Sequence, residues 1–466
     1  MAQQLAGNEV NVANRLDRLP ISSVHRLVLI GLAFAYFFEF GDLNTFAYTA
    51  PALEGFGVDK VALITSLSFI GMFVGGVSGG WFADRVGRKR GLIYTVAGYS
   101  VFSLLNATAW DPISLGIFRF FTGIGLSAMT VIANTYISEF FPAAVRGRFQ
   151  GWVMTIGLIG IPATSWVARL IIPLADWSWR LVFVWGALGI LALFFVSKMV
   201  ESPRWYEKHG KTREADEVMS HIEEVVSAER GPLAPAREAS TQQVVRSVPY
   251  SELFRGVYLK RTLVLLIAWI FQTLGFYGFT SWVPTLLKQH GFSLVNTLTY
   301  SSAIAIGAPI GALIAAFVSD RMDRKWSLTI TSVAIAIFGL LYGATFQPLL
   351  IVIFGFLVSV FIQTFAAFIY AYSPELYPTE ARASGAGFTY GVGRLANAFG
   401  PPIVSFLFVG FGYGSVFIYI AACWIIVALG VGLFGPLTSR RSLEQITEQE
   451  EQENAVQAAF SQEPAQ

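Results

Sequence analysis

The chain has 466 residues, of which 54% are hydrophobic and only 13% are charged, and its mean hydropathy is +0.57. Soluble globular chains carry about 25% charged residues, so this composition excludes a soluble multidomain enzyme. The formal net charge of +2 offers no basic surface for nucleic acid, and the single cysteine excludes an intrachain disulfide.

Twelve predominantly apolar runs are each long enough to cross a bilayer as a helix. They are residues 26–50, 61–83, 91–110, 112–138, 149–173, 179–198, 259–287, 296–319, 327–346, 348–372, 383–409 and 412–436. The polar stretch 199–258 separates two sets of six runs, which predict one bundle over 26–198 and another over 259–436. We expect an all-α membrane protein with twelve transmembrane helices, an N-terminal segment 1–25 and a tail 437–466.

Basic residues of the short loops predict the orientation in the membrane. On one side lie Arg85, Arg88, Lys89, Arg90, Arg146, Arg148, Arg321, Arg324, Lys325, Arg382, Arg440 and Arg441. The opposite loops offer little beyond Lys60 and Lys288. We therefore expect both termini and the central stretch to be cytoplasmic, in a plasma membrane (the inner membrane of a bacterium).

Two motifs of the first half recur in the second half. Asp84-Arg85-x-Gly87-Arg88-Lys89 returns as Asp320-Arg321-x-Asp323-Arg324-Lys325, and Tyr136-x-x-Glu139-x-x-Pro142-x-x-x-Arg146 returns as Tyr372-x-x-Glu375-x-x-Pro378-x-x-x-Arg382. Residue 84 corresponds to residue 320, and residue 136 corresponds to residue 372, so the separation along the chain is the same for both motifs. We call this separation the repeat offset. The two halves are therefore predicted to be parallel six-helix repeats, an architecture associated with transporters that alternate access around a central site.

The repeated charges predict ion pairs that close the cytoplasmic side. The candidate gating residues are Asp84, Arg88, Glu139, Arg146, Asp320, Arg324, Glu375 and Arg382. We expect Glu139 with Arg146, and Glu375 with Arg382, to form interdomain pairs that break in the inward-open state. The alternative is that the basic loops only set the topology.

Four charges inside the runs have no counterpart at the repeat offset: Glu39, Asp42, Arg119 and Arg394. Their equivalents are Gly275, Gly278, Gly355 and Leu158. An intramembrane charge costs about 2.5–3.5 kcal/mol on insertion scales, so it indicates function. A purely structural charge is expected in both halves; a static ion pair that fixes helix packing is the alternative.

Depth makes pairing plausible for two of these charges. At about 1.5 Å per residue, Asp42 lies about 12 Å and Arg119 about 10 Å from the outer ends of their runs. Movement of Arg119 toward and away from Asp42 or Glu39 changes the proton affinity of those acids. We therefore predict proton coupling by these three residues, driven by the proton gradient without a cofactor or a metal. Arg394, near mid-membrane, suits bidentate capture of a carboxylate.

The run 259–287 contains Gly275, Gly278 and Pro284, which we expect to break its helix, and broken helices often line transport sites. Polar side chains in this and later runs complete the predicted binding set. The predicted substrate-binding residues are Arg394, Gln272, Tyr277, Gln363 and Asn397.

On these motifs the sequence resembles the major facilitator superfamily. Gly80-x-x-x-Asp84-Arg85-x-Gly87-Arg88-Lys89 is similar to the superfamily's motif between the second and third helices. Arg146-Gly147 and Glu201-Ser202-Pro203-Arg204-Trp205 resemble its sugar-porter-like branch. The departures are Val200 in place of a proline, and Ala316 and Asp323 in place of glycines.

A narrower resemblance concerns the substrate. Glu39-Phe40-Gly41-Asp42 resembles the Asp-x-x-Asp element of aromatic acid/proton symporters and nicotinate-type carriers, with Glu39 in place of the first aspartate. Gln272 stands alone where sugar porters carry paired glutamines. The resemblance implies a transporter, not an enzyme, that takes up a small organic acid with protons. An aromatic monocarboxylate is the preferred substrate.

The implied partners are an anionic small molecule, protons and the lipid bilayer, with no nucleic acid, and the chain is expected to act as a monomer. A carrier of sugars or organic cations, and a membrane sensor that does not transport, stay open as alternatives.

Overall fold

The structure is a computed structural model that describes residues 12–53, 55–235, 253–318, 321–377 and 381–438. All regular elements within these residues are helical, and eleven helical stretches among them are long and apolar enough to cross a membrane. The packing divides the chain into two compact units, residues 1–54 with 67–243 and residues 55–66 with 244–466. Each unit is described by itself.

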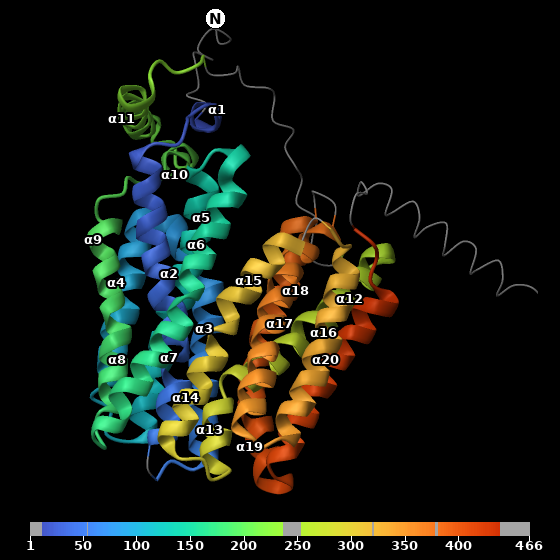
Figure 1. The fold of residues 1–466 in the computed structure, drawn as a ribbon. Coiled ribbons are helices and arrows are strands. Elements are labelled where there is room, and N and C mark those ends of the chain that lie inside the picture. Colours follow the sequence, from blue (N-terminus) through green and yellow to red (C-terminus); the bar gives the residue numbers. More distant parts are fainter. Residues whose placement is uncertain (1–11, 54, 236–252, 319–320, 378–380, 439–466) are drawn as a thin grey trace, which may run out of the picture. The chain divides into compact units, whose positions relative to one another are not determined.

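The first unit contains the helices up to α11 (Figure 1). These are α1 (Val12–Asp17), α2 (Ser23–Thr49), α3 (Val58–Val86, whose first residues belong to the second unit), α4 (Arg88–Asn106), α5 (Pro112–Phe140), α6 (Ala143–Leu158), α7 (Gly160–Ile171), α8 (Trp179–Ala187), α9 (Ala192–Val196), α10 (Pro203–Lys208) and α11 (Thr212–Arg230). The pairs α6 with α7 and α8 with α9 each make one membrane-length stretch.

The second unit contains the remaining helices. These are α12 (Gly256–Thr280), α13 (Val283–Gln289), α14 (Leu294–Ala305), α15 (Gly307–Val318), α16 (Arg324–Ala344), α17 (Pro348–Glu375), α18 (Arg382–Ala396), α19 (Gly400–Phe411) and α20 (Tyr413–Phe434). Each of the twelve predicted runs coincides with helix, which confirms the predicted all-α class. The predicted run 91–110 corresponds to α4, which is not among the eleven stretches that are long and apolar enough to cross a membrane. The first turn of α4 carries three basic residues.

Close helix contacts recur at the repeat offset. A Cβ on Gly75 of α3 would overlap the carbonyl oxygen of Ile124 in α5, and a Cβ on the equivalent Gly311 of α15 would overlap that of Val360 in α17. Small residues of this kind let membrane helices approach backbone to backbone. The same neighbours thus meet in both units, so the halves are parallel repeats in packing as well as in sequence.

The glycines of α12 do not break the helix, contrary to the sequence prediction. The helix continues through Gly275 and Gly278 to Thr280, and Pro284 lies in the first turn of α13. A Cβ on Gly275 would lie 2.6 Å from Nε1 of Trp424 in α20. The glycines therefore make room for the side chains of α20, and the break follows them at residues 281–282.

Extramembrane helices from the two polar segments pack together at one end of the first unit (Figure 1). The buried face of α11 carries Ala215, Met219, Ile222 and Val226, spaced by three or four residues as on one face of a helix, and belongs to the same core cluster as α1.

Ion pairs join α11 to the N-terminal segment. Arg15 donates to both carboxylate oxygens of Glu223, at 2.9 and 2.7 Å, and Arg18 donates to one of them at 2.7 Å. Burial raises the pKa of the Glu223 carboxyl, but the hydrogen bonds and charges of Arg15 and Arg18 outweigh burial and hold that pKa below its ordinary value. The N-terminal segment is thereby tied to the central polar stretch.

Candidate functional site

A buried acid–arginine cluster lies in the first unit, built from α2, α3 and α5. Nη1 of Arg119 lies 3.4 Å from Oδ1 of Asp42 and donates to the Asp42 carbonyl and to Oγ1 of Thr45, both at 3.3 Å. Its Nε donates to Oγ of Ser68 at 3.4 Å. Asp42 is 0% exposed and Arg119 is 2% exposed. The predicted pair of Asp42 and Arg119 is therefore present, with each charge offsetting the desolvation of the other.

The first unit leaves little space around this pair. A Cβ on Gly186 of α8 would lie 2.8 Å from both Oδ1 of Asp42 and Oγ of Ser103. Thr45 donates to Oδ1 of Asp42 at 2.9 Å, one turn along α2. The carboxylate is thus enclosed by protein atoms, where an electrostatic interaction is much stronger than in water.

Glu39 lies one turn before Asp42 on α2, is 4% exposed and accepts a 3.0 Å hydrogen bond from Oγ1 of Thr130. One turn earlier, Tyr36 donates to Oδ1 of Asn134 at 2.6 Å. The α2–α5 contact therefore carries a ladder of polar groups. Sequence reasoning missed Thr130 and Asn134, although polar residues four apart within an apolar run are the signal for such a ladder.

An arginine–tyrosine cluster lies in the second unit and comprises Trp269 and Tyr277 of α12, Tyr370 and Ser373 of α17, and Tyr390 and Arg394 of α18. Nε of Arg394 donates to the Tyr390 hydroxyl at 2.8 Å, and Nη1 donates to the Tyr277 hydroxyl at 3.4 Å. Within the described ranges, Arg394 has no carboxylate at ion-pair distance. Its guanidinium group instead donates hydrogen bonds to tyrosine hydroxyl groups.

The other predicted binding residues lie in the same unit but make different contacts. Gln272 donates to Oγ1 of Thr273 at 2.6 Å, and Asn397 is 1% exposed at the short turn that follows α18. Gln363 is half-buried, with its Cβ 3.0 Å from where a Cβ on Gly311 would lie. Among the residues described, none of the three predicted side chains is hydrogen-bonded to Arg394.

Three of the candidate gating residues of the first unit, Asp84, Arg88 and Glu139, form a compact charged cluster. Arg88 pairs with Asp84 at 2.7 Å and with Glu139 at 2.8 Å. Glu201 accepts from the backbone N–H of Arg88 at 2.6 Å, so it caps the start of α4. A Cβ on Gly87, whose φ is +101°, would overlap this carboxylate.

The second unit repeats the central pair of this cluster. Arg324 and Glu375 lie 2.8 Å apart, and they are the equivalents of Arg88 and Glu139 at the repeat offset. The observed partners of the two glutamates differ from those that the sequence predicted. Glu139 pairs with Arg88 where we expected Arg146, which donates to the Phe141 carbonyl at 3.3 Å, and Glu375 pairs with Arg324 where we expected Arg382. Asp320 lies outside the described residues.

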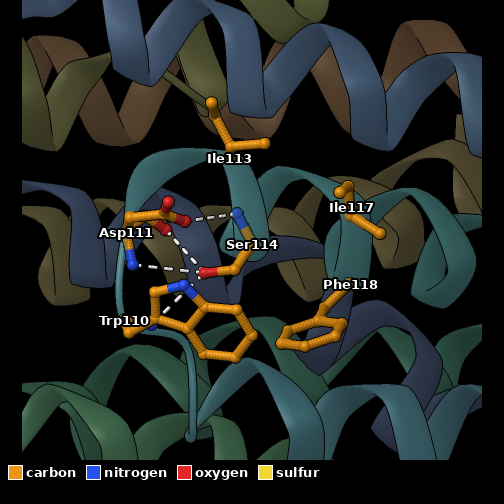
Figure 2. A pocket seen from close by; sticks show the side chains of 6 residues that line it. All are labelled: Trp110, Asp111, Ile113, Ser114, Ile117 and Phe118. Carbon is orange, nitrogen blue, oxygen red and sulfur yellow. Dashed lines mark hydrogen bonds between the residues drawn. The ribbon is translucent and has the colours of Figure 1, made fainter.

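A hollow at the start of α5 carries none of the candidate residues (Figure 2). Its polar groups serve the helix end: Oδ1 of Asp111 accepts from the N–H of Ser114 at 2.6 Å, and Oγ of Ser114 accepts from the N–H of Asp111 at 3.2 Å. The lining Trp110 is 75% exposed. The hollow is a capped helix end with apolar walls, and we place no substrate there.

Comparison with known proteins decides the family. Residues 28–449 match the family model described as "Sugar (and other) transporter". The chain belongs to this family. It is therefore a transporter of the major facilitator superfamily, a multi-pass membrane protein whose partner is a small-molecule substrate.

The relatives of this transporter are themselves named as transport proteins. It is 48% identical to the putative metabolite transport protein YyaJ of Bacillus subtilis, over 93% of this chain and 97% of the relative. It is 29% identical to the niacin transporter NiaP of Acinetobacter baylyi, over 94% of this chain and 100% of the relative. The partially occluded inward-open structure of the xylose transporter XylE from E. coli matches with a TM-score of 0.72 at 17% identity. That match covers 90% of this chain and 100% of the other, and shows a shared fold.

Proposed function

We propose that this transporter takes up a small aromatic monocarboxylate together with protons, by alternating access. The observation that carries the proposal is the state of Arg394, a cation within a membrane-length stretch that is held by the hydroxyls of Tyr277 and Tyr390. A guanidinium keeps its charge and binds a carboxylate through two parallel hydrogen bonds. An anionic substrate would supply the countercharge for it.

The substrate class has two further supports. The relative from Acinetobacter baylyi is named as a niacin transporter, and niacin is an aromatic monocarboxylate. Aromatic side chains surround Arg394: the ring of Trp269 lies 5.0 Å from that of Tyr390 and 5.2 Å from that of Tyr370. Rings of this kind favour planar aromatic ligands through edge and stacking contacts.

Proton coupling would reside in the acid–arginine cluster of the first unit. Arg119 beside Asp42 favours the charged form of its carboxyl group, and a step that draws Arg119 away would remove this interaction and favour protonation. Glu39, one turn away on α2, would exchange the proton along the same helix. The proton gradient is then the driving force, and no cofactor is needed.

The remaining elements of the proposal concern placement and gating. The distribution of basic loop residues supports a plasma-membrane protein with both termini cytoplasmic. Both clusters lie in one chain, which supports action as a monomer. The pairs of Arg88 with Glu139 and of Arg324 with Glu375, with the nearby Asp84, Arg146 and Arg382, would rearrange when the cytoplasmic side opens.

Uptake of radiolabelled nicotinate into proteoliposomes tests this function. Uptake should rise with an inward proton gradient and be competed by benzoate but not by a hexose or a quaternary amine. Arg394→Ala should abolish nicotinate uptake and keep the fold, whereas the matched control Arg148→Ala, at an exposed arginine, should retain it. Indifference to the gradient would refute proton coupling, and stronger competition by the hexose or the amine would refute the substrate class.

A further inference from the structure

The Tyr390 hydroxyl contacts the guanidinium of Arg394. Tyr390 precedes Arg394 by one turn of α18 and accepts from its Nε at 2.8 Å, while Cζ of Arg394 lies 5.1 Å from the Tyr390 ring centroid. A guanidinium has five N–H donors in one plane. Nε and Nη1 each donate one N–H to a tyrosine hydroxyl, and Nη2 donates to no group among the described residues, so three N–H donors are left for a carboxylate.

Tyr390 is itself held by two neighbouring helices. The indole of Trp269 packs against the Tyr390 ring at 5.0 Å with an interplanar angle of 83°. The indole N–H donates to Oγ of Ser373 at 2.9 Å, which fixes the indole on α17. A Cβ on Gly393 would lie 2.9 Å from Cβ of Trp269, so the glycine permits this close approach of α18 to α12. Ser373, Trp269, Tyr390 and Arg394 thus form one connected chain.

None of these side chains has a counterpart in the first half. At the repeat offset, the equivalents of Trp269, Ser373, Tyr390 and Arg394 are Ala33, Ile137, Met154 and Leu158. The helix contacts shared by the two repeats are made without them. The chain of contacts is therefore specific to the second unit, as expected of a functional device rather than of the common scaffold.

We infer that Tyr390 is a positioning residue that sets the direction of the Arg394 guanidinium and thereby the affinity for the substrate carboxylate. The inference rests on the proposed function, in which Arg394 binds that carboxylate. Trp269 and Ser373 support Tyr390, because they hold its ring in place. Discrimination between a carboxylate and its neutral amide depends on the hydroxyl of Tyr390.

The test compares nicotinate with nicotinamide in proteoliposomes that contain Tyr390→Phe. This variant keeps the ring and its packing on Trp269 and removes only the hydroxyl. We expect the KM for nicotinate to rise about five- to tenfold with maximal rate unchanged, since one charge-assisted hydrogen bond to Arg394 is lost and that from Tyr277 remains. We expect nicotinamide to inhibit nicotinate uptake only weakly in the wild type, and this inhibition should be the same in the variant. Tyr342→Phe, at a buried tyrosine of α16, is the matched control and should behave like the wild type.

Two further variants separate positioning from a structural role. In an Arg394→Lys background the planar guanidinium is absent, so Tyr390→Phe should add no further change in the KM for nicotinate. Trp269→Phe keeps a ring beside Tyr390 but loses the bond to Ser373, and should raise the KM for nicotinate by about two- to threefold with maximal rate unchanged.

The outcomes distinguish the inference from the proposed function. If Arg394→Ala abolishes nicotinate uptake while Tyr390→Phe leaves KM unchanged, or lowers only the maximal rate, the inference is refuted and the proposed function stands. If Arg394→Ala transports nicotinate normally, or the wild type does not transport it, the proposed function fails and the inference falls with it.

Discussion

Replacement of Asp42 by asparagine isolates the charge of the buried acid without changing its size. The carboxylate is fully buried, lies 3.4 Å from Nη1 of Arg119 and accepts from Thr45 at 2.9 Å. In Asp42→Asn, Arg119 would face a neutral amide in a buried site. Removal of one partner of a buried ion pair costs about 3–5 kcal/mol, because the other charge loses its compensation.

A second substitution should recover most of that loss. Arg119→Gln alone leaves Asp42 as a buried acid and is expected to cost about 3 kcal/mol. The double variant Asp42→Asn/Arg119→Gln removes both charges together with their desolvation penalties. We expect the free energy of unfolding of the double variant to lie within about 1–2 kcal/mol of that of the wild type. This small loss corresponds to a coupling energy of several kcal/mol between the two residues.

Chemical unfolding in detergent micelles measures these free energies, and transport separates the functional role. Asp42→Asn should lose proton-driven accumulation of nicotinate but retain counterflow exchange, which needs no net proton movement. Asp59→Asn, at an exposed acid in the first turn of α3, is the control and should change neither property. Additive losses in the double variant would refute the energetic reasoning, and proton-driven accumulation by Asp42→Asn would refute its role in coupling.

The extramembrane helices and the glycine contacts give two further predictions. Because the pKa of Glu223 is below its ordinary value of 4.5, this carboxylate stabilises the docking of α1 on α11 above that pH, and the stabilisation is lost as the pH falls through the lowered pKa. The protection of the α11 amides against hydrogen exchange, taken relative to the intrinsic exchange rate at each pH, should therefore decrease on acidification in the wild type. Glu223→Gln should exchange fast already at pH 7, with a loss of about 1 kcal/mol, and its failure to do so would argue against the role of Arg15 as partner. Gly75→Ala should destabilise the protein by about 1–3 kcal/mol or more, because its Cβ would overlap the backbone of α5. Gly98→Ala, with open space around its Cβ, should be neutral or stabilising by about 0.5–1 kcal/mol, and equal thermal shifts for the two alanine variants would contradict this account.

Much of the fold was predictable because its signals run along the chain. Apolar runs of membrane length and the shared repeat offset predicted the helices and the two repeats, and the packing of Gly75 and Gly311 against equivalent carbonyls follows the same offset. The depth of Asp42 and Arg119 along their helices was enough to predict that they pair. Depth follows from a fixed rise per residue and needs no knowledge of neighbouring helices.

The choice of partner was less predictable where several charges share one depth. Arg88 and Arg146 were both candidates for Glu139, and the structure pairs it with Arg88. Sequence reasoning likewise singled out Arg394 but not Tyr390, since tyrosines are common in apolar runs and only the geometry of α18 brings this hydroxyl to Nε.

The sequence by itself thus determined the class of protein, the positions of its helices along the chain, their repeat and the four unrepeated charges, because composition and spacing are properties of the chain. Only the tertiary structure decided which side chains meet, that Gly275 admits Trp424 without ending α12, and that Arg394 is held by Tyr390. Those outcomes depend on how each helix is rotated about its axis and which helix lies beside it. That arrangement is set by the packing of all helices together, and no local stretch of sequence specifies it.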